Sequence, residues 1–161
     1  MIDRECQAAA HNHISIRAAK DDDVEKMYRL EQMCFDIEAF STHQLQYLIN
    51  TKTAISYVAE ANGQFAGFII GLTNRNRFGR YGRVYTLDVD DSFRRMGIAM
   101  TLMDSLMQSL KEAGCTSCFL EVKMDNGRAI PLYEKMGFTR SRIVPNYYSN
   151  GVHALKMKKS L

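Results

Sequence analysis

The chain has 161 residues, of which 46% are hydrophobic and 24% are charged, the balance of an ordinary globular domain. A net charge of +3 suits an anionic cofactor and is weak support for nucleic acid, which we do not expect as a partner. No apolar run reaches the length of a membrane span, and no signal peptide is evident. We expect a cytoplasmic protein with a flexible tail over residues 1–13, a single domain over residues 14–161 and no membrane contact.

The four cysteines favour neither a redox centre nor a metal site. Cys115 and Cys118 have the C-x-x-C spacing, but a redox motif of that kind opens a helix, whereas this one follows a helix and enters a strand. A zinc site would need a second pair, and Cys6 and Cys34 stand alone. We expect ordinary reduced cysteines and no metal.

The first half of the chain predicts the order β-α-α-β-β. A strand over Ile14–Ala18 precedes three aspartates, Asp21–Asp23, which favour a helix start. A second helix is expected from Ser41, because Gln44 three residues later completes a capping box. Two strands then meet at Asn62-Gly63, a strong hairpin signal.

The second half predicts β-α-β-α-β-β. The polar, basic segment Asn74–Tyr81 is interpreted as a loop of unassigned role. A strand over Arg83–Val89 follows, then an amphipathic helix over Ile98–Glu112. The remaining elements are a strand over Ser117–Lys123, a short helix capped by Asn126, and a strand pair over Phe138–Ile143 and Val152–Lys158. This order predicts one mixed α/β domain.

Between the expected strand and the amphipathic helix lies Arg94-Arg95-Met96-Gly97-Ile98-Ala99. The first N–H groups of a helix have no intrahelical partner, and the helix dipole favours negative charge there. Gly97 lets a ligand approach the backbone closely, and the two arginines add charge. The segment therefore predicts a site for a pyrophosphate-bearing ligand.

This loop resembles the [QR]-x-x-G-x-[GA] acyl-CoA signature of the GNAT acetyltransferases. A second signature of that family resembles Leu120–Lys123, Asn126 and Ala129–Phe138, and Asn146-Tyr147-Tyr148 is similar to the RimI-type and archaeal N-terminal acetyltransferase branch. The resemblance implies a three-layer fold. In it, a mixed and mostly antiparallel sheet splays between two parallel central strands and carries helices on both faces.

The resemblance also implies acetyl-CoA as cosubstrate, lying between the two splayed strands. The pyrophosphate would be held by the loop, and the pantetheine arm by strand backbone. The residues that match these roles are Leu87, Val89, Arg94, Arg95, Gly97, Ile98, Ala99 and Asn126.

Glu121 and Tyr133 are the candidate catalytic residues. A carboxylate base matches an α-amino group, whose pKa is about 8, better than a lysine at about 10.4. A phenol remains protonated at neutral pH and can donate to a departing thiolate. In the resembling enzymes these two positions are base and acid. The alternatives are a salt bridge of Glu121 with Lys123 or an arginine, and simple packing of Tyr133.

Three further residues are expected at the acceptor entrance. The resemblance places Tyr147 and Tyr148 beside the peptide and Glu38 on the opposite wall, where it would steer a cationic N-terminus. Solvation in an exposed loop explains Glu38 equally well. RimI-type sequences commonly carry a tryptophan near this loop, and this chain has none, which leaves the acceptor open.

The resulting hypothesis is an N-acetyltransferase that acts on a protein N-terminus, such as that of a ribosomal protein, by direct transfer in a ternary complex. A lysine side chain or a small-molecule amine is the alternative acceptor. A non-catalytic acyl-CoA-binding regulatory module is a third reading. We expect a monomer or a weak homodimer.

Overall fold

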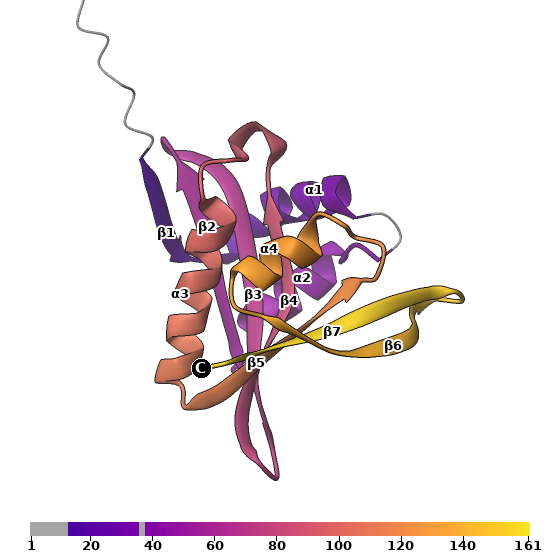
Figure 1. Ribbon diagram of the computed structural model, residues 1–161. Coiled ribbons are helices and arrows are strands. Elements are labelled where there is room, and N and C mark those ends of the chain that lie inside the picture. Colours follow the sequence, from indigo (N-terminus) through magenta and orange to yellow (C-terminus); the bar gives the residue numbers. More distant parts are fainter. Residues whose placement is uncertain (1–12, 36–37) are drawn as a thin grey trace, which may run out of the picture.

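The computed structural model describes residues 13–35 and 38–161, so the tail predicted over residues 1–13 lies almost wholly outside the described residues. Seven strands form one sheet there, with helices on both faces (Figure 1). The strands are β1 (Ile14–Ala18), β2 (Ala54–Ala61), β3 (Gln64–Asn76), β4 (Gly79–Val89), β5 (Cys115–Lys123), β6 (Thr139–Ser149) and β7 (Val152–Ser160). The helices are α1 (Val24–Cys34), α2 (Thr42–Asn50), α3 (Ile98–Glu112) and α4 (Ala129–Lys135), with 3-10 turns η1 (Asp21–Asp23) and η2 (Asp91–Phe93).

The sheet has the order β1-β2-β3-β4-β5-β7-β6, and only β4 and β5 run parallel. This confirms the predicted element order and the three-layer mixed fold. Pairing between the two parallel strands joins Arg80 to Cys115, Gly82 to Cys118 and Arg83 to Phe119, and ends there. Beyond this point the strands separate, so the sheet opens at its centre.

The short-range signals in the sequence act as predicted. Asn62 and Gly63 both have positive φ angles, 51° and 79°, which suit the tight turn between β2 and β3. The Ser41 hydroxyl accepts from the Gln44 N–H at 3.2 Å, and the Gln44 side chain accepts from the Ser41 N–H at 2.8 Å. This capping box starts α2.

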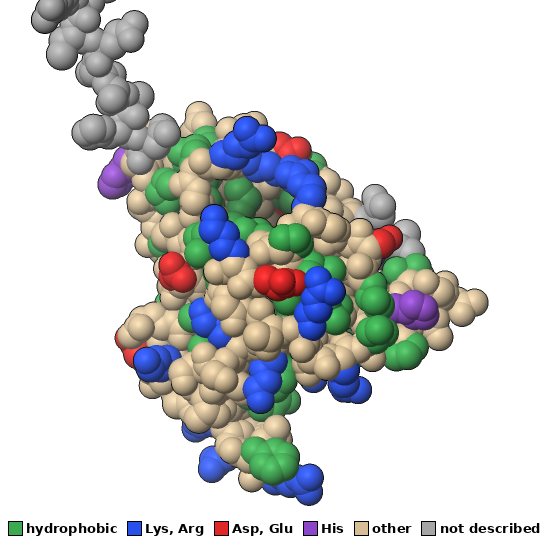
Figure 2. Space-filling view, in the orientation of Figure 1, with side chains coloured by type: hydrophobic (Ala, Val, Ile, Leu, Met, Phe, Trp, Pro, Cys, Tyr) green, Lys and Arg blue, Asp and Glu red, His purple; other side chains and the backbone are tan. Residues whose placement is uncertain are grey.

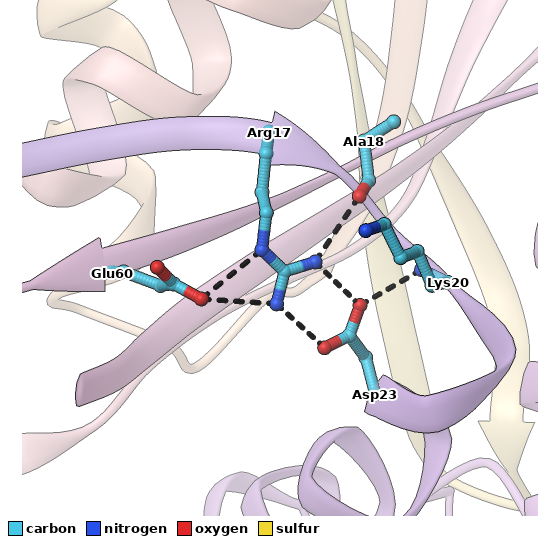
Figure 3. Close-up of polar contacts among 5 residues, drawn as sticks. All are labelled: Arg17, Ala18, Lys20, Asp23 and Glu60. Carbon is cyan, nitrogen blue, oxygen red and sulfur yellow. Dashed lines mark hydrogen bonds and ion pairs between the residues drawn. The ribbon is translucent and has the colours of Figure 1, made fainter. Parts of the chain in front are cut away.

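The aspartates before α1 do more than begin a helix. Asp23 accepts two hydrogen bonds from Arg17, both at 2.7 Å, and one from the Lys20 N–H at 2.8 Å (Figure 3). Arg17 also donates to Glu60 of β2 at 3.0 Å. The hydrogen bonds from Arg17 hold the pKa of Asp23 below its ordinary value, although burial opposes this. The network ties α1 to the edge of the sheet.

Two hydrophobic cores lie on opposite faces of the sheet. On one face, α3 buries a row of large side chains, Ile98, Leu102, Met103, Leu106, Met107 and Leu110. On the other face, α1 and α2 bury Met27, Leu30 and Leu45 against β2 and β3. The α3 row recurs at helical spacing, as the sequence predicted, and fixes the helix against the strands that open.

The interpretation of Asn74–Tyr81 as a loop is wrong. β3 continues to Asn76 and β4 begins at Gly79, and Asn74 pairs with Tyr81 and Arg75 with Arg80. The segment is thus the end of a long hairpin, which projects below the body of the protein (Figure 1). Its polar composition favoured a loop, but hydrogen bonds between the two strands form without an apolar face. β6 likewise extends past its predicted end at Ile143 to Ser149, although most of its residues are exposed.

The packing of α3 against β4 gives a first testable prediction. A Cβ added at Gly82 would lie 2.4 Å from Leu110 Cδ1 and 2.7 Å from Leu110 Cδ2. We expect Gly82→Ala to lower the free energy of unfolding by about 1–3 kcal/mol, because the Leu110 side chain must shift and is fully buried. The measurement is denaturant unfolding followed by circular dichroism. Gly127→Ala is the matched control, since nothing lies within 4 Å of its added Cβ. An equal loss in both variants would contradict this account.

Candidate active site

The separation of β4 from β5 opens a cavity of about 1060 Å³. Its walls come from the segment between α1 and α2, from β4 and β5, from the start of α3, from α4 and from β6. Every residue predicted for the site lines it: Glu38, Leu87, Val89, Arg94, Arg95, Gly97, Ile98, Ala99, Glu121, Asn126, Tyr133, Tyr147 and Tyr148. The structure thus brings together residues from six parts of the chain, and their individual roles remain predictions.

One end of the cavity is formed by the loop that leads into α3. Arg95 and Gly97 have positive φ angles, 63° and 76°, and these turn the chain sharply before the helix begins at Ile98. The N-cap residue, Gly97, has no side chain to cap the helix, so the first N–H groups can bind a ligand. Arg94 is bound to Asp91 at 2.7 Å. The geometry suits a phosphate group.

Next along the cavity lie Leu87 and Val89 of β4. They pair with Ile69 and Gly67 of β3 on one side, but β5 no longer pairs with this part of β4. The edge of β4 that faces β5 therefore keeps backbone groups for an extended ligand.

On the α4 side of the cavity, Asn126 holds the start of a helix. Its side-chain oxygen accepts from the Ala129 N–H at 3.0 Å, and its carbonyl accepts from the Ile130 N–H at 3.3 Å. This is the capping role predicted for Asn126.

Glu121 points from β5 into the middle of the cavity and is 12% exposed. Arg83 of β4 donates from Nε to Glu121 Oε2 at 3.0 Å and from Nη2 to the Tyr147 hydroxyl. The alternative of a salt bridge with an arginine is therefore realised, and Glu121 faces the cavity as well. Sequence reasoning placed Arg83 at the start of a strand and gave it no role in the site. No local signal reveals the pair, because the residues meet only through the register of β4 and β5.

Tyr133 lies on α4, with its ring edge-on to Phe138 at 6.1 Å between centroids. Burial, with a contribution from the charge of Asp88, raises its pKa to about 12. The phenol therefore carries its proton at neutral pH, which an acid for a thiolate needs. Both readings of this residue hold in part, since the ring packs and also lines the cavity.

The acceptor side of the cavity is closed by an aromatic pair and an ion pair. Tyr147 and Tyr148 stack edge-to-face at 4.9 Å, and burial raises the pKa of both. Glu38 binds Lys123, whose ammonium lies 5.7 Å from the Tyr148 ring. Burial opposes the charge on Glu38, but the hydrogen bond from Lys123 lowers its pKa. The reading of Glu38 as a solvated loop residue is wrong, because its side chain is only 15% exposed.

Two buried acids lie beside the cavity, Glu31 as one of its lining residues, and the sequence analysis did not assign them a role. Asp88 and Glu31 are each 1% exposed, and the Thr86 hydroxyl lies 2.8 Å from Asp88 Oδ1 and 3.0 Å from Glu31 Oε2. Burial, together with a hydrogen bond and repulsion from Glu31, raises the pKa of Asp88 well above its ordinary value. Glu31 Oε1 also accepts from the Phe40 N–H at 3.3 Å, which anchors the segment between α1 and α2.

Three cysteines lie within the described ranges, and all three are free thiols. Cys115 and Cys118 are buried free thiols, as expected, and burial raises the pKa of Cys118 to about 12. Cys34 is free and exposed, and Cys6 lies outside the described residues. In residues 13–35 and 38–161, no three His, Cys, Asp or Glu side chains are grouped to hold a metal ion. Over the same ranges, no helix is long and apolar enough to cross a membrane.

One protein-family model matches the part of the chain that contains most of this site. The model of the "Acetyltransferase (GNAT) family" matches residues 24–138, from α1 to the end of the α4 segment. The chain belongs to the GNAT acetyltransferase family. The resemblance seen in the two sequence signatures is thereby confirmed.

Individual relatives show the same relationship. The chain is 30% identical to N-alpha-acetyltransferase 30 of Xenopus laevis over 93% of its own length, but it spans only 59% of that protein. Ard1 from Thermoplasma volcanium superposes with a TM-score of 0.81 at 30% identity, covering 92% of this chain and 97% of that one. A chain of the NatC complex, solved with Gag peptide and CoA, has the same fold, with a TM-score of 0.81 at 24% identity and coverage of 92% and 99%.

Buried Asp88 makes a pH-dependent contribution to the stability of this GNAT protein. Because its pKa is raised in the folded state, Asp88 keeps its proton there above about pH 4, where the unfolded chain loses it, so the contribution of this group to stability falls as pH rises. Asn resembles a protonated carboxyl group, so Asp88→Asn should be more stable than the original protein at about pH 7.5 and less distinct from it at about pH 5. Denaturant unfolding at both pH values measures this. A constant difference between the two proteins would refute the assignment.

Proposed function

We propose that this protein transfers the acetyl group of acetyl-CoA to the α-amino group of a protein N-terminus. The observation that carries the proposal is a single cavity that joins an anion site at a helix start to a carboxylate and a protonated phenol. The names of the frog relative and of a structural neighbour of this chain, the NatC complex bound to Gag peptide and CoA, support the same acceptor class. Transfer is direct, within a ternary complex.

The cosubstrate would enter along the opened strands. The pyrophosphate is held at the start of α3 by Arg94, Arg95 and the N–H groups from Gly97 to Ala99. The pantetheine arm then pairs with the free edge of β4 at Leu87 and Val89. Asn126 lies on the opposite side, where it caps α4. This placement directs the thioester toward Glu121 and Tyr133.

Glu121 then accepts a proton from the acceptor's ammonium group, directly or through a water molecule. Its Oε2 is bound by Arg83, which leaves Oε1 for this task. The neutral amine attacks the thioester carbonyl, the carbon–sulfur bond breaks, and Tyr133 donates its proton to the departing thiolate. The second proton of the attacking amine is released as the amide forms and restores the phenol. The products are an N-acetylated chain and CoA.

The acceptor chain would pass between Tyr147 and Tyr148 on one side and Glu38 on the other. The tyrosine hydroxyls can bind the peptide backbone. Because Lys123 neutralises Glu38, this wall offers shape and hydrogen bonds more than net negative charge.

The first test is a panel of acceptors. Thiol release from acetyl-CoA should occur with short peptides that have free N-termini, and the rate should depend on their first residues. Peptides blocked at the N-terminus but carrying lysine, and spermidine, are the comparison. Turnover confined to blocked lysine peptides or to spermidine would overturn the proposal. Binding of acetyl-CoA without turnover on any amine would indicate a regulatory module instead.

The role of Glu121 gives a second test. Glu121→Gln keeps the shape of the side chain but removes the base, so kcat should fall by about 10²–10⁴-fold. The Kd for acetyl-CoA, measured by calorimetry, should stay within about twofold, since the carboxylate lies on the acceptor side. Glu134→Gln is the matched control, because that exposed residue forms an ion pair with Arg140 at the surface of α4 and does not line the cavity. An unchanged kcat at saturating acceptor would remove Glu121 from the mechanism.

The anion site is tested by replacing Gly97, whose backbone adopts a positive φ angle, with a residue that is strained in that conformation. Gly97→Val should weaken acetyl-CoA binding by at least about tenfold, because a β-branched residue is strained at a φ of 76°. Gly151→Val is the matched control: its φ is 79°, nothing lies within 4 Å of an added Cβ, and it is in the turn between β6 and β7. Calorimetric titration with acetyl-CoA distinguishes the two. Equal affinity in both variants would place the pyrophosphate elsewhere.

A further inference from the structure

Beyond Glu121, the sheet continues into two strands that are strongly basic. β6 and β7 are described in full and carry Arg140, Arg142, Lys156, Lys158 and Lys159 without a single carboxylate. Arg140 binds Glu134, and the Lys159 ammonium donates to the Met136 carbonyl. No salt bridge is formed by the other three within the described residues. Their charge is available to a partner.

The strand register places these three side chains on the face that carries Glu121. Lys156 lies opposite Glu121, Lys158 opposite Phe119, and Arg142 opposite Lys156. Residues directly opposite one another in a sheet project to the same side. We call Arg142, Lys156 and Lys158 the basic strip. It begins beside the candidate base and leads away from the cavity.

Aromatic rings hold the lysines of the strip in place. The Lys156 and Lys158 ammonium groups lie 4.6 Å and 5.6 Å from the centroid of Phe119, and Tyr81 packs edge-on to the same ring at 5.7 Å. A cation over a ring face is attracted by the ring quadrupole, which limits its motion. The strip thus presents two positive charges at fixed positions.

The strip continues into the projecting hairpin of β3 and β4. A depression of about 240 Å³ lies between them, and its lining includes Phe78, Arg80, Tyr81, Phe119 and Lys158 but no acidic residue. Arg75 and Arg77 follow at the end of the hairpin. In the space-filling view, basic side chains gather around a hydrophobic one on the lower projection (Figure 2).

We propose that the basic strip and this depression bind an acidic segment of the acceptor protein, a few residues after its N-terminus. The inference rests on the proposed function, since it needs the acceptor amine at Glu121. An extended chain advances about 3.3 Å per residue. Acceptor residues from about the third to the eighth would then pass over the strip and the depression. Carboxylates there would meet the ammonium and guanidinium groups of the strip, which form no salt bridge with the carboxylates of residues 13–35 and 38–161.

The same surface is less suited to nucleic acid. Single-stranded RNA or DNA gains most from bases stacked on open aromatic faces. Phe119 already has two ammonium groups and a tyrosine edge against it, and the Arg77 guanidinium lies 4.7 Å from the ring of Phe78. A flexible acidic peptide needs only carboxylates within reach of these cations. The strip also begins beside the cavity, which favours a segment of the acceptor protein as the molecule that binds it.

The test uses the full chain and two peptide series with the same first three residues. Positions four to eight are acidic in one series and are the corresponding amides, Asn and Gln, in the other. We expect the acidic series to have a kcat/KM about tenfold higher at low salt, mostly through KM, because several weak surface pairs add together. The difference should shrink toward twofold at about 0.5 M salt, where charges at a surface are screened.

Variants of the strip show whether it is the cause. Arg142→Glu together with Lys158→Glu should reduce the acidic-to-amide ratio of kcat/KM to about one or below. Lys111→Glu is the control for a single charge reversal away from the strip, since Lys111 lies in the last turn of α3, and it should keep the ratio. Using a ratio removes any common effect of a variant on catalysis or folding.

A binding measurement separates this inference from the proposed function. N-acetylated, fluorescently labelled peptides of both series are titrated with the protein in the presence of CoA, and anisotropy is followed. Tighter binding of the acidic series, lost in the double variant, supports the strip even if no free peptide is acetylated. Equal binding and equal kcat/KM for both series overturn the inference while leaving N-terminal acetylation intact. Binding of a single-stranded RNA oligonucleotide that depends on Lys158, with no preference for acidic peptides, also overturns it.

Discussion

The site depends on where two parallel strands stop pairing. β4 and β5 are joined only as far as Arg83 and Phe119, and every residue of the candidate site lies at or beyond that point or on the elements that cover it. A continuous ladder would use the backbone of Leu87 and Val89 within the sheet and leave no cavity. The separation costs backbone hydrogen bonds, which a ligand that lies between the strands can restore. The two cores fix the helices on either face of the opened sheet, because α3 and the pair α1 and α2 are each anchored by buried apolar rows.

Arg83 links this geometry to the chemistry. It is the last residue of β4 that pairs with β5, and its side chain binds both Glu121 and the Tyr147 hydroxyl. One guanidinium thus connects the candidate base with the wall of the acceptor entrance. Its planar fork suits two partners at fixed directions, which a lysine would not provide. Arg83 of β4 therefore holds Glu121 and Tyr147 in place, and the second carboxylate oxygen of Glu121 is left for an amine.

The sequence predicts those parts of this architecture that depend on local patterns. The capping box at Ser41, the turn at Asn62-Gly63 and the apolar row of α3 follow from neighbouring residues, and the loop before α3 follows from its signature. The sequence does not predict features that depend on the pairing register of the strands or on how deeply a side chain is buried. The pairs Arg83–Glu121 and Lys123–Glu38 join distant segments, and no spacing rule reveals them.

The two ion pairs also constrain how an acceptor is recognised. An incoming ammonium group meets Glu121 and Glu38 only after each has been paired, with Arg83 and Lys123. Long-range attraction to a positive N-terminus is therefore weak, because each carboxylate and its partner form a nearly neutral group. Selectivity must then come from contacts made along the acceptor chain. The basic strip of Arg142, Lys156 and Lys158 lies beside Glu121. If the acceptor follows the proposed route, the charge that selects it is positive and lies outside the candidate catalytic centre.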